Sequence, residues 1–158
     1  ITLEQYELRE KLLGPEAYET MSTLNNLALI YSKTGRFEEA EAAHRKEWQI
    51  SQRTLGSDHP EVLISMLNLG RVLERSGKSD EAADILTDAL SRADRVLPEV
   101  HPLLAAITTA CGEVALEQGD RDRAIELFLA SRRIYEQMFE PGHPRFDRLD
   151  ELIAQAQS

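Results

Sequence analysis

Three histidines recur at an even spacing along the chain, and a proline follows each of them. His59, His101 and His143 lie 42 residues apart. Imidazole nitrogens can ligate a metal ion or carry protons. A zinc site, however, needs its ligand nitrogens about 2.0–2.1 Å from one ion, whereas equivalent positions on successive packed helices lie roughly 8–10 Å apart or more. We therefore expect no metal site here and interpret the histidines as loop residues of a repeating fold.

The residues around the first of these pairs are typical of a helix start. In "LGSDHP" (55–60), Gly56 lies where one helix is expected to end and Pro60 where the next begins. Proline is favoured in a first helical turn because its missing N–H costs nothing there. Ser57, Asp58 or His59 can accept bonds from the free amides of that turn, and the proline holds His59 extended.

The same period extends through the rest of the sequence. "LNNLALIYSKTGRFEEA" (24–40) aligns with "MLNLGRVLERSGKSDEA" (66–82) and then with "TACGEVALEQGDRDRA", which ends at Ala124, and no insertion is needed. Apolar residues recur at i, i+3, i+4 and i+7, which predicts amphipathic helices. A glycine closes the first helix of each period, and small residues at two further positions allow close helix approach. These recurring positions are Gly35/Gly77/Gly119, Ala28/Gly70/Gly112 and Ala40/Ala82/Ala124.

Six complete helices are predicted, near residues 17–33, 37–54, 60–75, 79–96, 102–117 and 121–138. Residues 1–13 fit a second helix without its partner, and residues 145–157 fit a first helix without its partner. We expect a single unit over 1–158, with a trailing helix at 1–13, repeats at 14–55, 56–97 and 98–139, and a solubilising carboxyl-terminal cap at 140–158. Because the chain starts without methionine, we expect it to be part of a longer protein that carries more repeats.

Composition excludes several classes of function. The 158 residues carry a formal charge of −10, which argues against nonspecific binding to nucleic acid or to an anionic membrane. No apolar run approaches the ~18–20 residues that a membrane helix needs, and the charged amino end is not a signal peptide. A single cysteine, Cys111, rules out an internal disulfide and fits a reducing, cytoplasmic location.

The sequence offers almost nothing for catalysis. It has no glycine-rich phosphate loop, no His-Glu-x-x-His, no G-x-S-x-G elbow and no cysteine pair for zinc. Cys111 lies in the middle of a predicted helix on its apolar face, so we expect a buried and unreactive thiol. We predict a protein that is not an enzyme and has no cofactor and no metal.

The repeated segments and the LGSDHP loop resemble tetratricopeptide repeats, in particular the 42-residue variety found in kinesin light chains. The resemblance implies an all-α fold, a right-handed superhelical solenoid of antiparallel helix pairs, with three full pairs and a half at each end. It also implies a non-catalytic interaction module whose concave surface, lined mainly by the first helix of each pair, binds peptides or partner proteins.

By the pattern of that family, the first helices supply the candidate partner-binding residues. These are Asn25, Asn26, Leu29, Lys33, Ile64, Asn68, Arg71 and Arg75. Asparagine offers both donor and acceptor, so Asn26 and Asn68 can bracket the backbone of an extended peptide. Arg71 and Arg75 suit a carboxylate, which favours a partner with acidic residues. The alternative is a merely solvated helix face. The chaperone-binding carboxylate clamp of some relatives is not expected, because its basic positions are missing.

Two other functions stay open. The array could be the sensor or assembly arm of a larger signalling protein, such as an ATPase or kinase, packed against its own chain. It could also self-associate through the amino-terminal helix, where Leu3 and Leu8 are apolar. Separately, His44 stands where the later repeats have Leu86 and Phe128. We interpret it as a buried histidine with a bonded nitrogen, and a pH-sensitive joint is the sharper hypothesis.

Overall fold

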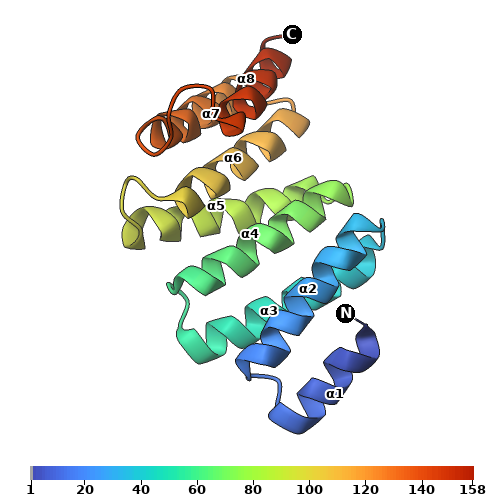
Figure 1. Cartoon of the computed structure of the whole chain (residues 1–158). Helices are drawn as coiled ribbons and strands as arrows, with labels where there is room; N and C mark the ends of the chain where they lie inside the picture. Colours follow the sequence, from blue (N-terminus) through green and yellow to red (C-terminus); the bar gives the residue numbers. More distant parts are fainter. Residues whose placement is uncertain (1) are drawn as a thin grey trace. The chain divides into compact units, whose positions relative to one another are not determined.

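The structure is a computed structural model and describes residues 2–158. Ile1, which the prediction for 1–13 includes, lies outside the described residues. Within them the secondary structure is entirely helical, which confirms the predicted all-α class (Figure 1). The helices are α1 (Leu3–Leu13), α2 (Tyr18–Lys33), α3 (Phe37–Leu55), α4 (Pro60–Arg75), α5 (Ser79–Val96), α6 (Pro102–Glu117), α7 (Arg121–Glu136) and α8 (Pro144–Gln157).

The helix bounds follow the predictions closely. The helices α4, α5 and α6 begin and end at the predicted residues. The helix α7 ends at Glu136 and not at the predicted residue 138, because the N–H groups of Met138 and Phe139 both donate to the carbonyl of Tyr135 at 2.9 Å and close a turn there. Periodicity alone does not show such a turn.

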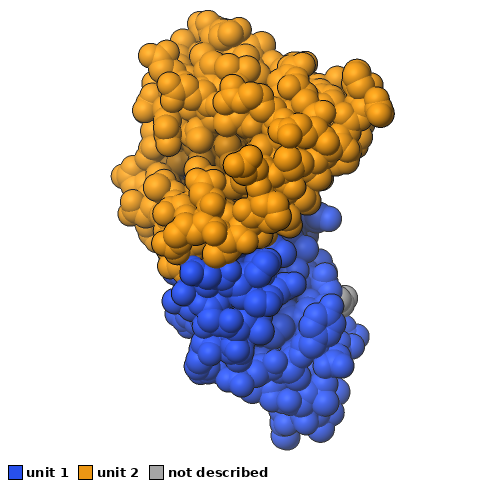
Figure 2. Space-filling view, turned by 90° about the vertical axis from the view of Figure 1, so that its left-hand side faces the viewer, with its two compact units in different colours: residues 1–78 blue, residues 79–158 orange. Residues whose placement is uncertain are grey.

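The chain forms two compact units, residues 1–78 and 79–158 (Figure 2). In unit 1, α1 packs against α2, α2 against α3, and α3 against α4. In unit 2, α5 packs against α6, α6 against α7, and α7 against α8. The division lies inside the predicted repeat 56–97. A single solenoid over 1–158 therefore stays a prediction.

A glycine in the left-handed region is the middle residue of the three-residue connection between the two helices of a pair. Gly35 has a φ of 77°, and the glycines at the same place in the later repeats, Gly77 and Gly119, have φ values of 78° and 81°. Residues with a Cβ are strained in this region, so glycine is the residue that the turn requires. The alignment predicted this role from spacing alone.

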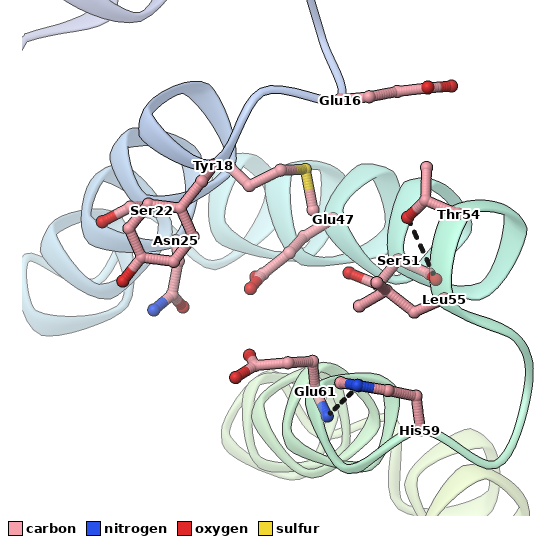
Figure 3. A pocket seen from close by; sticks show the side chains of 11 residues that line it. Glu16, Tyr18, Ser22, Asn25, Glu47, Ser51, Thr54, Leu55, His59 and Glu61 are labelled. Carbon is pink, nitrogen blue, oxygen red and sulfur yellow. Dashed lines mark hydrogen bonds between the residues drawn. The ribbon is translucent and has the colours of Figure 1, made fainter.

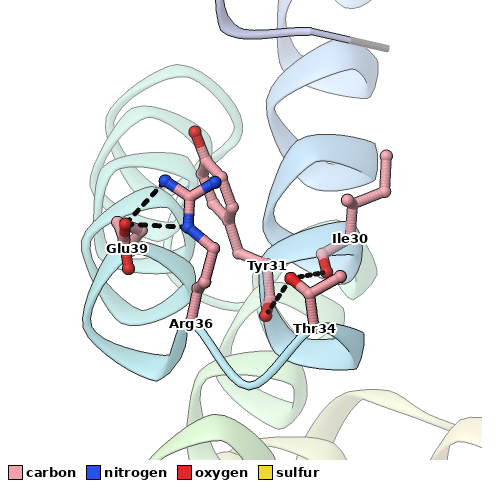
Figure 4. Close-up of polar contacts among 5 residues, drawn as sticks. All are labelled: Ile30, Tyr31, Thr34, Arg36 and Glu39. Carbon is pink, nitrogen blue, oxygen red and sulfur yellow. Dashed lines mark hydrogen bonds and ion pairs between the residues drawn. The ribbon is translucent and has the colours of Figure 1, made fainter.

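Side chains close the turn after α2 (Figure 4). The Thr34 hydroxyl donates to the carbonyl of Ile30 at 2.9 Å, which occupies one of the free carbonyls at the helix end. The Arg36 guanidinium lies 4.3 Å from the centroid of the Tyr31 ring and pairs with Glu39 at 2.6 Å. The turn is thus fixed by backbone, hydroxyl and stacking contacts together.

The three His-Pro pairs start helices, as predicted. His59, His101 and His143 are the N-caps of α4, α6 and α8, and each proline takes a first-turn position. Each Nδ1 accepts a backbone N–H two residues ahead, at 3.2, 3.1 and 3.3 Å. Each ring therefore serves its own helix. Among the described residues, no group of three or more side chains could hold a metal ion.

Each unit has its own apolar core. Unit 1 buries Tyr6 of α1 with Leu24, Leu27 and Ala28 of α2 and Ala40 of α3. Unit 2 is centred on residues of α6, α7 and α8 that include Ala124, Phe128, Tyr135, Leu149 and Leu152. For the last helix the sequence predicts an apolar stripe of Phe146, Leu149, Ile153 and Ala156. The structure buries Phe146, Leu149 and Ala156, whereas Ile153 is only half-buried and Leu152 is buried instead.

Small residues allow α6 and α7 to approach closely in unit 2. Gly112 is buried, and a Cβ built on it would lie 2.6 Å from a ring carbon of Phe128. Phe128 is itself 0% exposed, so the ring is enclosed by other atoms of the protein and cannot turn out into solvent in place. The glycine is therefore required by packing and not by backbone conformation.

Cys111 is half-buried on α6, and its thiol donates to the carbonyl of Leu86 at 3.4 Å. Burial raises the pKa of the Cys111 thiol to about 12. The thiolate that reacts with electrophiles is therefore scarce at neutral pH, in agreement with the predicted inert thiol. No helix among the described residues has the length and apolar character to cross a membrane.

His44 is 1% exposed, and its Nδ1 lies 3.0 Å from Oε2 of Glu47. This contact confirms a buried histidine with a bonded nitrogen. The pH-sensitive joint stays a hypothesis, which the pH dependence of the melting temperature of a His44→Leu variant tests. The amphipathic pattern of the predicted helix near 37–54 places Leu55 on its inward side, and this prediction is wrong. Leu55 is 47% exposed, because it ends α3 and is followed by an exposed stretch up to residue 60.

Candidate interaction surface

All eight candidate partner-binding residues lie in unit 1, on two helices. Those on α2 are Asn25, Asn26, Leu29 and Lys33, and those on α4 are Ile64, Asn68, Arg71 and Arg75. Asn26, Leu29, Lys33, Arg71 and Arg75 are exposed, and the other three are half-buried. None of them belongs to the fully buried core, so each can contribute surface to a partner.

One pair of these side chains meets between α2 and α4. Nδ2 of Asn68 donates to Oδ1 of Asn25 at 3.4 Å, a long bond between residues 43 positions apart. The bond leaves the amide N–H groups of Asn25 and the amide oxygen of Asn68 with capacity for a ligand. The sequence offers Asn26 and Asn68 as the residues that bracket a peptide backbone, which stays a prediction. The structure joins Asn68 to Asn25 and leaves Asn26 exposed.

The two arginines of α4 differ in their surroundings. Nη1 of Arg75 donates to the Ser32 hydroxyl at 2.7 Å, and the guanidinium lies 5.2 Å from the centroid of the Phe37 ring. These contacts hold Arg75 against the connection between α2 and α3. Arg71 is exposed one turn earlier on α4. Arg71 is therefore better placed than Arg75 to bind a carboxylate of a partner.

A pocket of about 420 Å³ lies beside this surface in unit 1 (Figure 3). The beginning of α2, the second half of α3 and the beginning of α4 form it. Its lining residues are Glu16, Tyr18, Met21, Ser22, Asn25, Glu47, Ser51, Thr54, Leu55, His59 and Glu61. Asn25 is the residue that this pocket shares with the candidate set, so the pocket adjoins the asparagine pair.

The lining of the pocket is acidic. It contains the carboxylates of Glu16, Glu47 and Glu61 and neither lysine nor arginine. Glu16 pairs with Arg53 at 2.6 Å, and Glu47 with His44. The Glu47 side chain is only 10% exposed, so its charge lies in a less polar environment than that of a surface carboxylate.

Sequence reasoning missed this pocket, although one signal pointed to it. Glu47 stands where the later repeats have Ala89 and Ser131, both of which are 0% exposed. A charged residue at a position that is small and buried elsewhere marks a local exception in the repeat. His44, which replaces Leu86 and Phe128, is the second half of the same exception.

The family follows from sequence profiles of the tetratricopeptide repeat. One profile matches residues 3–47 and 19–95, and a second matches residues 67–138. The chain belongs to the tetratricopeptide repeat family. Members of this family generally mediate protein–protein interaction and are typically non-enzymatic scaffolds.

Solved structures of the same type resemble this tetratricopeptide repeat chain. A Podospora anserina protein described as a kinesin light chain with nearly identical TPR-like repeats matches with a TM-score of 0.81 and 24% identity, over 86% of this chain and 64% of that one. BtubC (BKLC) from P. vanneervenii matches with a TM-score of 0.72 and 20% identity, over 87% of this chain and 57% of that one. The chain thus spans less than two thirds of either protein. None of the curated proteins matches the sequence.

The neighbours agree with the predicted repeat type. The kinesin-light-chain-like resemblance, which the sequence carried in its 42-residue period, is confirmed by the structures that share the fold. At this level of identity the likeness concerns the fold alone. The binding residues of this tetratricopeptide repeat chain must be argued from its own side chains.

Proposed function

We propose that unit 1 binds an extended segment of a partner protein across α2 and α4. The observation that carries this proposal is the Asn25–Asn68 amide pair, which joins the two helices and keeps donors and an acceptor for a ligand. A peptide backbone offers alternating N–H and C=O groups, and an asparagine side chain can bond both. Binding of this kind depends little on the sequence of the partner.

Side-chain selectivity would come from the residues around that pair. Exposed Arg71 can form a forked contact with a carboxylate, and exposed Leu29 adds apolar surface on α2. Asn26 and Lys33 extend the polar surface along α2, and Ile64 and Arg75 extend the surface along α4. A partner segment with an acidic residue near Arg71 is the ligand that these groups favour.

A protein partner is also the class that the charge favours. The formal charge of −10 opposes binding to the phosphate backbone of nucleic acid. A cytoplasmic location is part of the proposal, because the single thiol remains free in a reducing compartment. Catalysis is not part of it, since proteins of the tetratricopeptide repeat family are typically non-enzymatic scaffolds.

The test compares the wild-type chain with an Asn68→Ala/Arg71→Glu variant in affinity capture from a lysate of the source organism. Arg133→Glu, an exposed residue of α7, makes the same charge change in unit 2 and serves as the control. We expect a protein that binds wild type and the control and is lost with the double variant. Equal capture by all three would place the site elsewhere, and capture by none would favour the intramolecular arm.

A second candidate, self-association, is favoured by the exposed leucines of α1. Leu3, Leu8, Leu12 and Leu13 are 49%, 57%, 70% and 54% exposed. Leu8 and Leu12 are four positions apart, so they share one side of this helix of 11 residues and form the apolar surface that self-association would use. Light scattering at increasing concentration tests it: a mass that rises for wild type and stays constant for Leu8→Gln/Leu12→Gln supports self-association.

A further inference from the structure

We propose that the pocket of unit 1 binds a basic side chain, lysine or arginine, of the partner segment. The proposal deepens the function proposed above and rests on it where the basic residue is said to belong to that segment. Three properties of the pocket carry it: its apolar wall, its acidic lining and its continuity with the asparagine pair (Figure 3).

The wall of the pocket suits the stem of a long basic side chain. Tyr18 and Leu55 line it and are 82% and 47% exposed, so their apolar surface is not used in the core of the unit. Met21 adds a flexible apolar side chain to the lining. Lysine and arginine bury their methylene groups along such surface and leave the charge at the tip. The Tyr18 ring can also accept the cation over its face.

The acidic lining suits the tip. One oxygen of Glu47 contacts Nδ1 of His44. Within the described residues this carboxylate has no other hydrogen bond, so its second oxygen is left for a ligand. The Glu61 carboxylate comes from the facing helix, α4. Because no lysine or arginine lines the pocket, a cation from outside would complete these charges.

Groups of opposite character around the pocket do not reverse this preference. Arg53 contacts Glu16 and leaves Glu47 and Glu61 untouched. The amino end of α4 favours negative charge, but Nδ1 of His59 already accepts the N–H of Glu61 at 3.2 Å. An acidic ligand would lie among three carboxylates and be repelled by them.

Asn25 links the pocket to the rest of the surface. It lines the pocket, and its amide oxygen accepts the bond from Asn68. A segment whose backbone lies on these two amides can therefore direct one side chain into the pocket. With Arg71 farther along α4, the favoured partner carries a basic residue for the pocket and an acidic residue for the arginine. Such a charge pattern would fix the register of the segment.

The experiment uses the full chain labelled with nitrogen-15 and four small probes, followed by amide chemical shifts. The probes are the N-acetyl amides of arginine, lysine, citrulline and glutamate. We expect saturable shifts at Met21, Asn25 and Ser51 with arginine or lysine. Citrulline, which has the shape of arginine without its charge, should bind at least about tenfold more weakly. No saturation with either basic probe, or equal shifts with citrulline or glutamate, would overturn the proposal.

Matched variants separate charge from shape. Glu61 is exposed at the rim of the pocket, and Glu61→Gln is expected to weaken the affinity for the tighter-binding basic probe about tenfold. Glu47→Gln should weaken that affinity at least as much. Glu38→Gln, an exposed residue of the first turn of α3 that does not line the pocket, should change nothing. If Glu47→Gln fails to fold because His44 loses its partner, Glu61→Gln still decides. Unchanged probe affinity in that variant would refute the acidic site.

The result is independent of the proposed function. The Asn68→Ala/Arg71→Glu variant leaves both pocket carboxylates in place and should still bind the basic probe. If the wild-type chain binds the basic probe and the Asn68→Ala/Arg71→Glu variant still captures the partner, the proposed binding across α2 and α4 is refuted and the pocket proposal stands. If that variant loses the partner and neither it nor wild type binds a basic probe, the pocket proposal is refuted and the proposed binding across α2 and α4 stands.

Discussion

The contact between Gly112 and Phe128 allows a quantitative prediction for Gly112→Ala. The added Cβ would lie 2.6 Å from a ring carbon, about 1 Å short of a normal carbon–carbon contact. The ring is 0% exposed, so α6 and α7 must separate or the ring must leave its rotamer. Overpacking of this kind costs about 1–3 kcal/mol, and the severity of the contact places it at the upper end.

Helix propensity acts in the opposite direction. Alanine in a helix interior is favoured over glycine by about 1 kcal/mol. We therefore expect Gly112→Ala to lower the free energy of unfolding by about 2 kcal/mol in total. The two terms have opposite signs, so the sign of the measured change decides between packing and propensity.

The assay is urea unfolding followed by circular dichroism, with a double-mutant cycle. Phe128→Leu, which places at 128 the residue type found at Leu86 one repeat earlier, removes the clash. Because the smaller side chain relieves the packing cost, the double variant Gly112→Ala/Phe128→Leu should be more stable than the two single changes added together predict, by up to about 3 kcal/mol. A Gly112→Ala variant as stable as wild type, or more stable, would refute the packing argument.

Three further predictions follow from single contacts. Because burial raises the pKa of the Cys111 thiol to about 12, the native protein should react with a thiol reagent at pH 8 far more slowly than the protein in urea, and equal rates would contradict this. His101→Ala should cost about 1 kcal/mol in a thermal melt through loss of the N-cap of α6, whereas His101→Asn, which keeps an acceptor, should cost less. Hydrogen bonds from Lys46 and Tyr6 lower the pKa of Glu10 below its ordinary value of 4.5. Because this pKa is lower in the folded protein, the ionised carboxylate of Glu10 stabilises the fold above pH 4.5, and this stabilisation is lost as the pH falls through the folded pKa. Glu10→Gln should therefore be less stable than wild type at pH 7, by about 0.5 kcal/mol, and as stable as wild type in strong acid. A difference that persists in strong acid would contradict this.

Most of the helical architecture could be predicted because it repeats. The period fixed the places of Gly35 and the three His-Pro pairs. Local rules of capping and turn formation act over a few residues, so the sequence carries them directly.

The candidate site was less accessible from the sequence. The pocket is formed by Tyr18, Glu47 and Glu61 from three helices, and no local pattern joins them. The exposure of Leu55 depends on what covers the last turn of α3, which the amphipathic pattern does not describe. The bond between Asn25 and Asn68 was not expected from the sequence, because neighbouring asparagines on a helix differ by about 100° in direction and only packing selects which of them meets Asn68.

The nearly constant backbone angle at Gly35, Gly77 and Gly119 has a consequence for how such genes change. Each turn returns the chain to the same conformation after 42 residues. Unequal recombination that duplicates or deletes 42 codons therefore leaves each helix followed by the same type of helix as before. Copy number becomes a heritable trait that can vary without new compensating substitutions. Point mutation can then specialise one copy, as His44 and Glu47 illustrate, while the other copies keep the apolar or small residues of the common pattern.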